Sequence, residues 1–67
     1  MNDLPSEVRN RRRALGLTQD ELAELSSCSA RFIRALEAGK ESVRLDKLVL
    51  VLDALGLELR LGLRVPS

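Results

Sequence analysis

Residues 18–40, TQDELAELSSCSARFIRALEAGK, carry the signals of two short helices joined by a tight turn. Thr18 and Glu21 have the spacing of a capping box, in which each side chain accepts a hydrogen bond from the other residue's backbone N–H. Ser29 is suited to cap a second helix, and Gly39 suits the left-handed residue that ends a helix. These signals predict a compact two-helix unit over residues 18–39.

The segments TQDELA and SARFIRALEAGK resemble the helix-turn-helix of the phage-repressor and Cro-type (XRE) DNA-binding family. The resemblance covers roughly residues 6–56 without an insertion, and several fixed offsets agree at once. It implies a mainly α, lambda-repressor-like bundle of four or five helices. The family places glycine in the turn, whereas this chain has Ser27, so either the serine adopts a strained positive φ or the turn is built differently.

The length and composition set further limits. A chain of 67 residues allows a single domain with a small core, which favours oligomerisation. The chain has no histidine and one cysteine, so a disulfide framework and thiolate or imidazole metal sites are excluded and no cofactor is expected. Because it has neither a signal peptide nor a long uncharged apolar run, we expect a soluble, cytoplasmic protein without a membrane partner. The net charge of +1 says little about nucleic acid, so the distribution of charge matters more.

A first helix is expected to start at Pro5 or Ser6, after a flexible tail over residues 1–5, with Val8 and Leu15 facing inward.

This helix also carries arginines at positions 9, 11, 12 and 13, and a solvated helix face explains such a cluster as well as a binding role does. The family resemblance singles out Arg12, whose equivalent pairs with the glutamate at the Glu37 position. We interpret this ion pair as structural and not as a DNA-reading feature.

The helix expected over residues 30–38 is the recognition helix that the resemblance implies. An α-helix fits the major groove, and the planar fork of arginine matches the O6 and N7 acceptors of guanine. We therefore assign base contacts to Ala30, Arg31 and Arg34, although two exposed arginines alone would indicate only a solvated face. Three roles remain open for Phe32: packing on a helix edge, contact with DNA, or contact with a protein partner.

A second group of residues is assigned to phosphate contacts, which position a protein on DNA without reading its sequence. In the family that the chain resembles, a glutamine hydrogen-bonds a phosphate, and Gln19 stands at the matching position. Gln19 can equally well be interpreted as an exposed residue at the start of a helix with no binding role. The candidates are Gln19, Ser29, Lys40, Ser42 and Arg44.

Residues 45–55 predict a fourth helix with more apolar residues than one small core needs, which implies a second buried surface. Its expected inward face comprises Leu45, Leu48, Val49, Leu52 and Leu55. From 57 to 65 apolar residues alternate strictly, which predicts a half-buried β-strand. A lone strand needs a partner from another chain, so we expect a homodimer. Its interface residues are assigned as Val51, Leu57, Leu59, Leu61 and Leu63.

A helix-turn-helix followed by one C-terminal strand resembles the HipB-like antitoxins, whose protomers pair such strands across a dimer. In a two-fold antiparallel pair, apolar faces must meet and like charges should not stand opposite each other. Centring the pair on Leu61 satisfies both conditions, because Leu59 then faces Leu63, and Glu58 faces Arg64 of the second chain.

These features predict a homodimeric, sequence-specific DNA-binding repressor, and the resemblance points to an autoregulating antitoxin of a type II toxin–antitoxin operon with a cognate toxin as partner. Two-fold symmetry would set two recognition helices about one helical turn (~34 Å) apart on an inverted-repeat operator. The alternative is a protein-interaction adaptor that keeps the fold without sequence-specific DNA binding. An enzyme is not expected, since the sequence offers no nucleophile–base pair and no glycine-rich phosphate loop.

Overall fold

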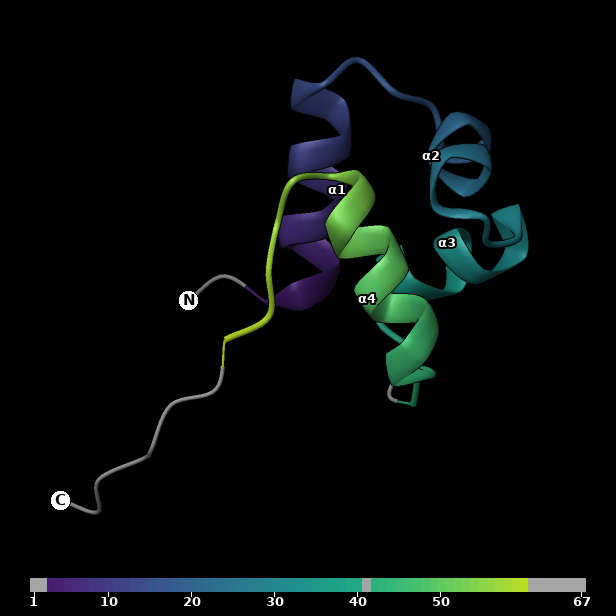
Figure 1. Cartoon of the computed structure of the whole chain (residues 1–67), viewed down its shortest axis with the longest axis vertical. Helices are drawn as coiled ribbons and strands as arrows, with labels where there is room; N and C mark the ends of the chain where they lie inside the picture. Colours follow the sequence, from purple (N-terminus) through teal and green to yellow (C-terminus); the bar gives the residue numbers. More distant parts are fainter. Residues whose placement is uncertain (1–2, 41, 61–67) are drawn as a thin grey trace, which may run out of the picture.

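The computed structural model describes residues 3–40 and 42–60, which form a bundle of four helices (Figure 1). These are α1 (Leu4–Ala14), α2 (Gln19–Ser26), α3 (Ala30–Glu37) and α4 (Leu45–Ala54). α2 packs against both α3 and α4, and α1 packs against α3. The prediction of a mainly α helix-turn-helix bundle is confirmed over these ranges. None of the described helices has the length and apolarity that crossing a membrane requires.

α1 begins earlier in the chain than the sequence suggested. Asp3 is its N-cap, and Asp3 Oδ1 accepts a hydrogen bond from the backbone N–H of Ser6 at 3.0 Å. Pro5 falls in the first turn, where its missing N–H costs nothing. Leu4 packs against the core. The expected flexible tail over residues 1–5 is therefore too long, because residues 4 and 5 already belong to the helix.

The α2–turn–α3 unit is built from the local signals that the sequence carries. Thr18 Oγ1 accepts the N–H of Glu21 at 3.0 Å, and Glu21 Oε1 accepts the N–H of Thr18 at 2.8 Å, so the capping box is confirmed. Ser27 adopts the left-handed conformation, with φ 58° and ψ 31°. Of the two possibilities for this turn, the serine therefore takes the strained positive φ. Ser29 Oγ then caps α3 by accepting the N–H of Phe32 at 3.0 Å.

Replacing Ser27 with glycine is expected to stabilise the fold. The left-handed conformation costs an L-residue roughly 1–2 kcal/mol, whereas glycine loses about 0.5–1 kcal/mol more backbone entropy on folding. We therefore expect the free energy of unfolding to rise by about 0.5–1 kcal/mol in urea titrations. Ser27→Ala keeps the Cβ atom and should give no gain, and a stabilised alanine variant would contradict the explanation.

The core is aliphatic and receives residues from all four helices. Its buried members are Val8, Leu22, Ala23, Ile33, Leu36, Leu48, Val51, Leu52 and Leu55. The predicted inward positions of Leu15, Leu45 and Val49 are wrong, since all three side chains are exposed. Leu15 already lies past the end of α1. α4 has apolar residues on most of its circumference, so its periodicity alone does not decide which side faces the core.

The strand expected over residues 57–65 does not form over its described part, residues 57–60. The backbone N–H of Leu57 donates to the carbonyl of Leu52 at 2.8 Å and ends the helix, and the Leu57 side chain packs against the core. Residues 61–65 of the expected strand, with Leu61 and Leu63, lie outside the described residues. Pairing between two chains stays a prediction.

Candidate nucleic-acid interface

α3 presents one side to solvent along its whole length. Its inner side buries Ile33 and Leu36, whereas Arg31 and Arg34 are exposed on the outer side. Ala30, the first residue of α3, is half-buried and packs against the core. Arg31 makes no ion pair with any residue in the described part of the chain. The N-terminal end of α3 therefore offers a guanidinium without a competing carboxylate.

Arg34 is less well placed for a base contact than Arg31. Its Nη1 atom lies 4.0 Å from Asp20 Oδ1 at the start of α2, and both side chains are well exposed. An exposed ion pair contributes only about 0–1 kcal/mol, so Arg34 can leave it easily. The Asp20 carboxylate nevertheless opposes the approach of a phosphate at this point.

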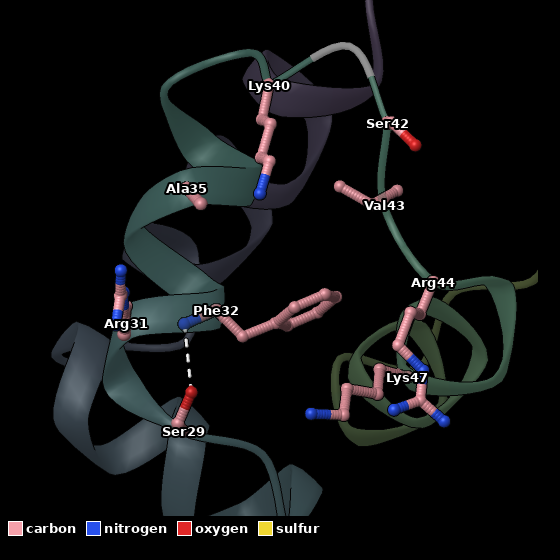
Figure 2. A pocket seen from close by; sticks show the side chains of 9 residues that line it. All are labelled: Ser29, Arg31, Phe32, Ala35, Lys40, Ser42, Val43, Arg44 and Lys47. Carbon is pink, nitrogen blue, oxygen red and sulfur yellow. Dashed lines mark hydrogen bonds between the residues drawn. The ribbon is translucent and has the colours of Figure 1, made fainter.

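A groove of about 250 Å³ lies between α3, α4 and the loop that joins them (Figure 2), and we call it the α3–α4 groove. It brings together four of the assigned phosphate residues: Ser29, Lys40, Ser42 and Arg44. Its basic side chains are Arg31, Lys40, Arg44 and Lys47, and none of the described residues that line it is acidic. Its apolar side chains are Phe32, Ala35 and Val43. The groove therefore combines a positive rim with an apolar wall.

Two of the assigned phosphate residues in the groove already have partners. Ser29 Oγ caps α3, as described above. Arg44 donates two hydrogen bonds to Asp46, at 2.7 and 3.1 Å, and these bonds lower the pKa of the Asp46 carboxyl. Both side chains of this pair are exposed, so Arg44 can exchange its carboxylate for a phosphate at little cost.

Lys47 is a groove residue that sequence reasoning did not select. Its Nζ atom lies 5.8 Å from the centroid of the Phe32 ring, within the range of a cation–π interaction. Phe32 is half-buried and packs against the core, which agrees with the first of its three open roles, while its ring also lines the groove. The sequence feature that could have pointed to Lys47 is its position in the first turn of a helix, where the helix dipole disfavours a cation.

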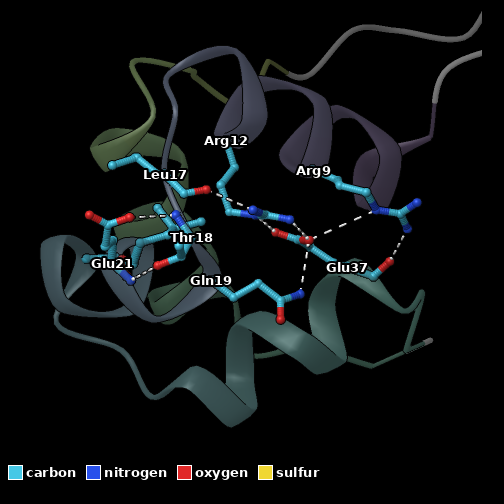
Figure 3. Close-up of polar contacts among 9 residues, drawn as sticks. Arg9, Arg12, Leu17, Thr18, Gln19, Glu21 and Glu37 are labelled. Carbon is cyan, nitrogen blue, oxygen red and sulfur yellow. Dashed lines mark hydrogen bonds and ion pairs between the residues drawn. The ribbon is translucent and has the colours of Figure 1, made fainter.

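Gln19 lies apart from the α3–α4 groove, in a buried polar network around Glu37 (Figure 3). Arg12 donates to both carboxylate oxygens of Glu37, through Nε at 2.7 Å and Nη2 at 2.9 Å, and through Nη1 to the carbonyl of Leu17 at 2.8 Å. Gln19 Nε2 adds a bond of 3.2 Å to Glu37 Oε1, and Arg9 Nη2 donates to the Glu37 carbonyl at 2.8 Å. The network ties α1, α2 and α3 together.

Charge neutralisation inside this network decides the ionisation of Glu37. Burial raises the pKa of Glu37, but hydrogen bonds from Arg12 and Gln19 and the positive charges of Arg12 and Arg9 outweigh it. The net effect is a Glu37 pKa below its ordinary value of 4.5. The carboxylate is therefore the stable form inside the fold.

The lowered pKa of Glu37 predicts a loss of stability in acid. A depressed carboxyl pKa contributes stability that is present above the unfolded value of 4.5 and is lost as the pH falls through the folded value. We expect the free energy of unfolding to fall as the pH drops below 4.5, and carboxyl NMR titration to place the Glu37 pKa below 4.5. A measured pKa at or above that value would contradict the network.

The surface assigned to dimerisation needs one correction. Val51 is fully buried in the core of the protomer, so it has no surface to offer a second chain. The exposed large apolar residues of α4 are instead Leu45, Val49 and Leu50, of which the last two are 49% and 47% exposed. Val49 lines a groove together with Leu57 and Leu59, two of the assigned residues, so an apolar surface continues from α4 into the following segment.

The remaining chemistry of the described residues is simple. Residues 3–40 and 42–60 contain no cluster of three or more His, Cys, Asp or Glu side chains that could hold a metal ion. Within the same ranges every buried side-chain nitrogen or oxygen has a hydrogen-bond partner. The exposed cations and hydroxyls around α3 suit the binding of an anion.

A helix bundle with a capped two-helix unit and a solvent-facing, basic second helix defines the class of helix-turn-helix proteins. Comparison with known sequences agrees, because a helix-turn-helix family profile matches residues 8–61. The chain is also similar to the uncharacterized HTH-type transcriptional regulator y4mF of Sinorhizobium fredii, with 43% identity over 54 residues that cover 81% of this chain and 71% of the relative. The chain belongs to the helix-turn-helix family.

Proposed function

We propose that the protein is a sequence-specific, DNA-binding transcriptional repressor that inserts α3 into the major groove. The observation that carries the proposal is the exposed N-terminal end of α3, where Arg31, which forms no ion pair with any described residue, stands beside the basic α3–α4 groove. Family membership and the similarity to a transcriptional regulator support it. Four cations lie together at the groove although the net charge of the chain is only +1, and for nucleic-acid binding the distribution of charge matters more than its total.

Within this proposal, the residues divide into two roles. Arg31 reads a guanine through its planar fork, with Arg34 and the small Ala30 beside it. The groove residues Ser29, Lys40, Ser42 and Arg44 hold phosphates and fix the position of α3 without reading bases. Gln19 has one free amide hydrogen beyond its bond to Glu37, so it can still donate to a phosphate near the start of α2.

The protein acts as a homodimer on an inverted repeat, with two α3 helices about one helical turn apart. Support comes from the small core of a 67-residue chain and from the exposed apolar residues of α4 that continue into Leu57 and Leu59. We also propose that the protein is the antitoxin of a toxin–antitoxin pair, because a helix-turn-helix followed by the alternating segment 57–65 resembles the HipB-like antitoxins. A cytoplasmic location follows from the same role.

Replacing Arg31 with alanine tests base reading. We expect specific binding to weaken by about 1–3 kcal/mol, with preference relaxed at one base position, because a bidentate contact is lost. Lys40→Ala is the matched control, and it should weaken binding to all sequences alike and reduce the salt dependence. If Arg31→Ala lowers specific and non-specific affinity equally, the base-reading role is wrong.

A protein-interaction adaptor is the second candidate, and one feature of α2 favours it. Leu25 is 62% exposed and shares a surface depression with Leu17, Glu21 and Glu24. The exposed Leu25 beside the carboxylates of Glu21 and Glu24 suits a basic protein partner, and the two negative charges repel DNA. Binding to a basic protein, without any binding to DNA, would favour this candidate.

A further inference from the structure

Phe32 and Val43 pack against the core, and the side that each turns to the α3–α4 groove has no part in the proposed function. The Phe32 ring projects from α3 across the groove, and Val43 in the joining loop faces it (Figure 2). Lys47 extends from α4 beneath the ring, with Nζ 5.8 Å from its centroid. An apolar wall beside cations suits a ligand that has an apolar part next to an anionic one.

The placement of Lys47 and Arg44 works against the stability of α4. Arg44 occupies the N-cap position but its side chain makes no capping hydrogen bond, and Lys47 lies in the first turn. Both cations stand at the positive end of the helix dipole, where positive charge destabilises a helix and anions are attracted. Asp46 pairs with Arg44, and no described residue that lines the groove is acidic, so the charge of Lys47 can meet an external anion there.

The size of the groove indicates what kind of anion fits. Its volume of about 250 Å³ is below the roughly 300–1,000 Å³ of pockets that enclose a small molecule. A shallow groove of this kind suits one unit of a chain that passes over the surface. A unit of the DNA backbone has the required chemistry, since the carbon face of deoxyribose is apolar and the phosphate beside it is anionic.

We propose that the α3–α4 groove clasps one sugar–phosphate unit of the DNA strand that borders α3. The Phe32 ring packs against the deoxyribose, and Lys47, restrained by that ring, donates to the phosphate. Both residues position the protein and neither reads a base. This proposal rests on the proposed function and adds to it a backbone-contacting pair.

The test measures binding of the full chain to two duplexes, one selected for tight binding and one of mixed sequence, at several salt concentrations. Lys47→Gln should weaken binding to both duplexes by the same factor and reduce the slope of log affinity against log salt by about 0.9, as loss of one phosphate contact does. Lys47→Arg should retain the slope. Phe32→Leu should weaken binding to both duplexes and leave the slope unchanged, because no charge is lost.

Asp53→Asn is the control, because it changes one charge at the far end of the same helix and should leave the slope unaltered. Urea unfolding of each variant separates lost binding from lost folding. A wild-type slope for Lys47→Gln, a loss confined to the selected duplex, or full affinity in Phe32→Leu would overturn the clasp while DNA binding stands. Failure of the wild-type chain to bind either duplex would instead refute the proposed function itself.

Discussion

Replacing Glu37 with glutamine should destabilise the fold by about 3–5 kcal/mol, enough to unfold much of so small a domain. Glutamine preserves the shape of the side chain but removes its charge. The Arg12 guanidinium then stays buried, at 8% exposure, without a carboxylate to balance it. Urea unfolding followed by circular dichroism, with a stabilising osmolyte if the variant is unfolded in buffer, measures the effect.

The exposed pair of Arg44 and Asp46 supplies the matched control. Its shortest N–O distance is 2.7 Å, the same as that of Arg12 and Glu37, but its side chains are 69% and 63% exposed. Asp46→Asn should therefore cost less than about 1 kcal/mol. A double-mutant cycle of Arg12→Met with Glu37→Gln should show strong coupling. A cycle without coupling would contradict the claim that this ion pair stabilises the fold.

Deleting residues 58–67 is expected to weaken binding to a two-half-site operator by about 10²–10⁴-fold, because two linked half-site contacts become one. The deletion keeps Leu57, whose backbone N–H ends α4, so the bundle should still fold. Sedimentation equilibrium should find the truncated chain monomeric, while the single half-site is bound as weakly as by the full chain. Removing only residues 66 and 67 is the control and should change neither property.

A truncated chain that remains dimeric and binds the full operator normally would exclude the C-terminal segment from the interface. The exposed Val49 and Leu50 of α4 would then be the surface to examine, since they need no strand. Val49→Ser with Leu50→Ser would test that surface.

The local signals in the sequence were sufficient for the helix-turn-helix unit. Capping boxes and N-caps act over three residues, so Thr18, Glu21 and Ser29 could be assigned from spacing alone. The same kind of signal is present at Asp3, although the predicted start of the helix is Pro5 or Ser6. Element boundaries depend on single side-chain bonds of this sort, and they are easily displaced by one or two residues.

The features that the sequence did not reveal depend on tertiary contacts. Because α4 is apolar on most sides, its neighbours decide which side faces the core. For that reason the assignment of Val51 to a dimer interface is wrong, and its side chain is buried in the core. Lys47 and Phe32 are 15 positions apart and belong to different helices, so only the folded chain shows that they share a groove. Burial of the Arg12 and Glu37 side chains is likewise a property of the assembled bundle.

Selection from a random duplex library tests the central claim most directly, because it requires no knowledge of the operator. The full chain should enrich an inverted repeat with half-sites about one helical turn apart, and the affinity for the enriched sequence should fall steeply with salt. The same selection with Arg31→Ala should lose preference at one position in each half-site. A library that shows no enrichment after repeated rounds, or binding that is insensitive to salt, would contradict a sequence-specific DNA-binding role.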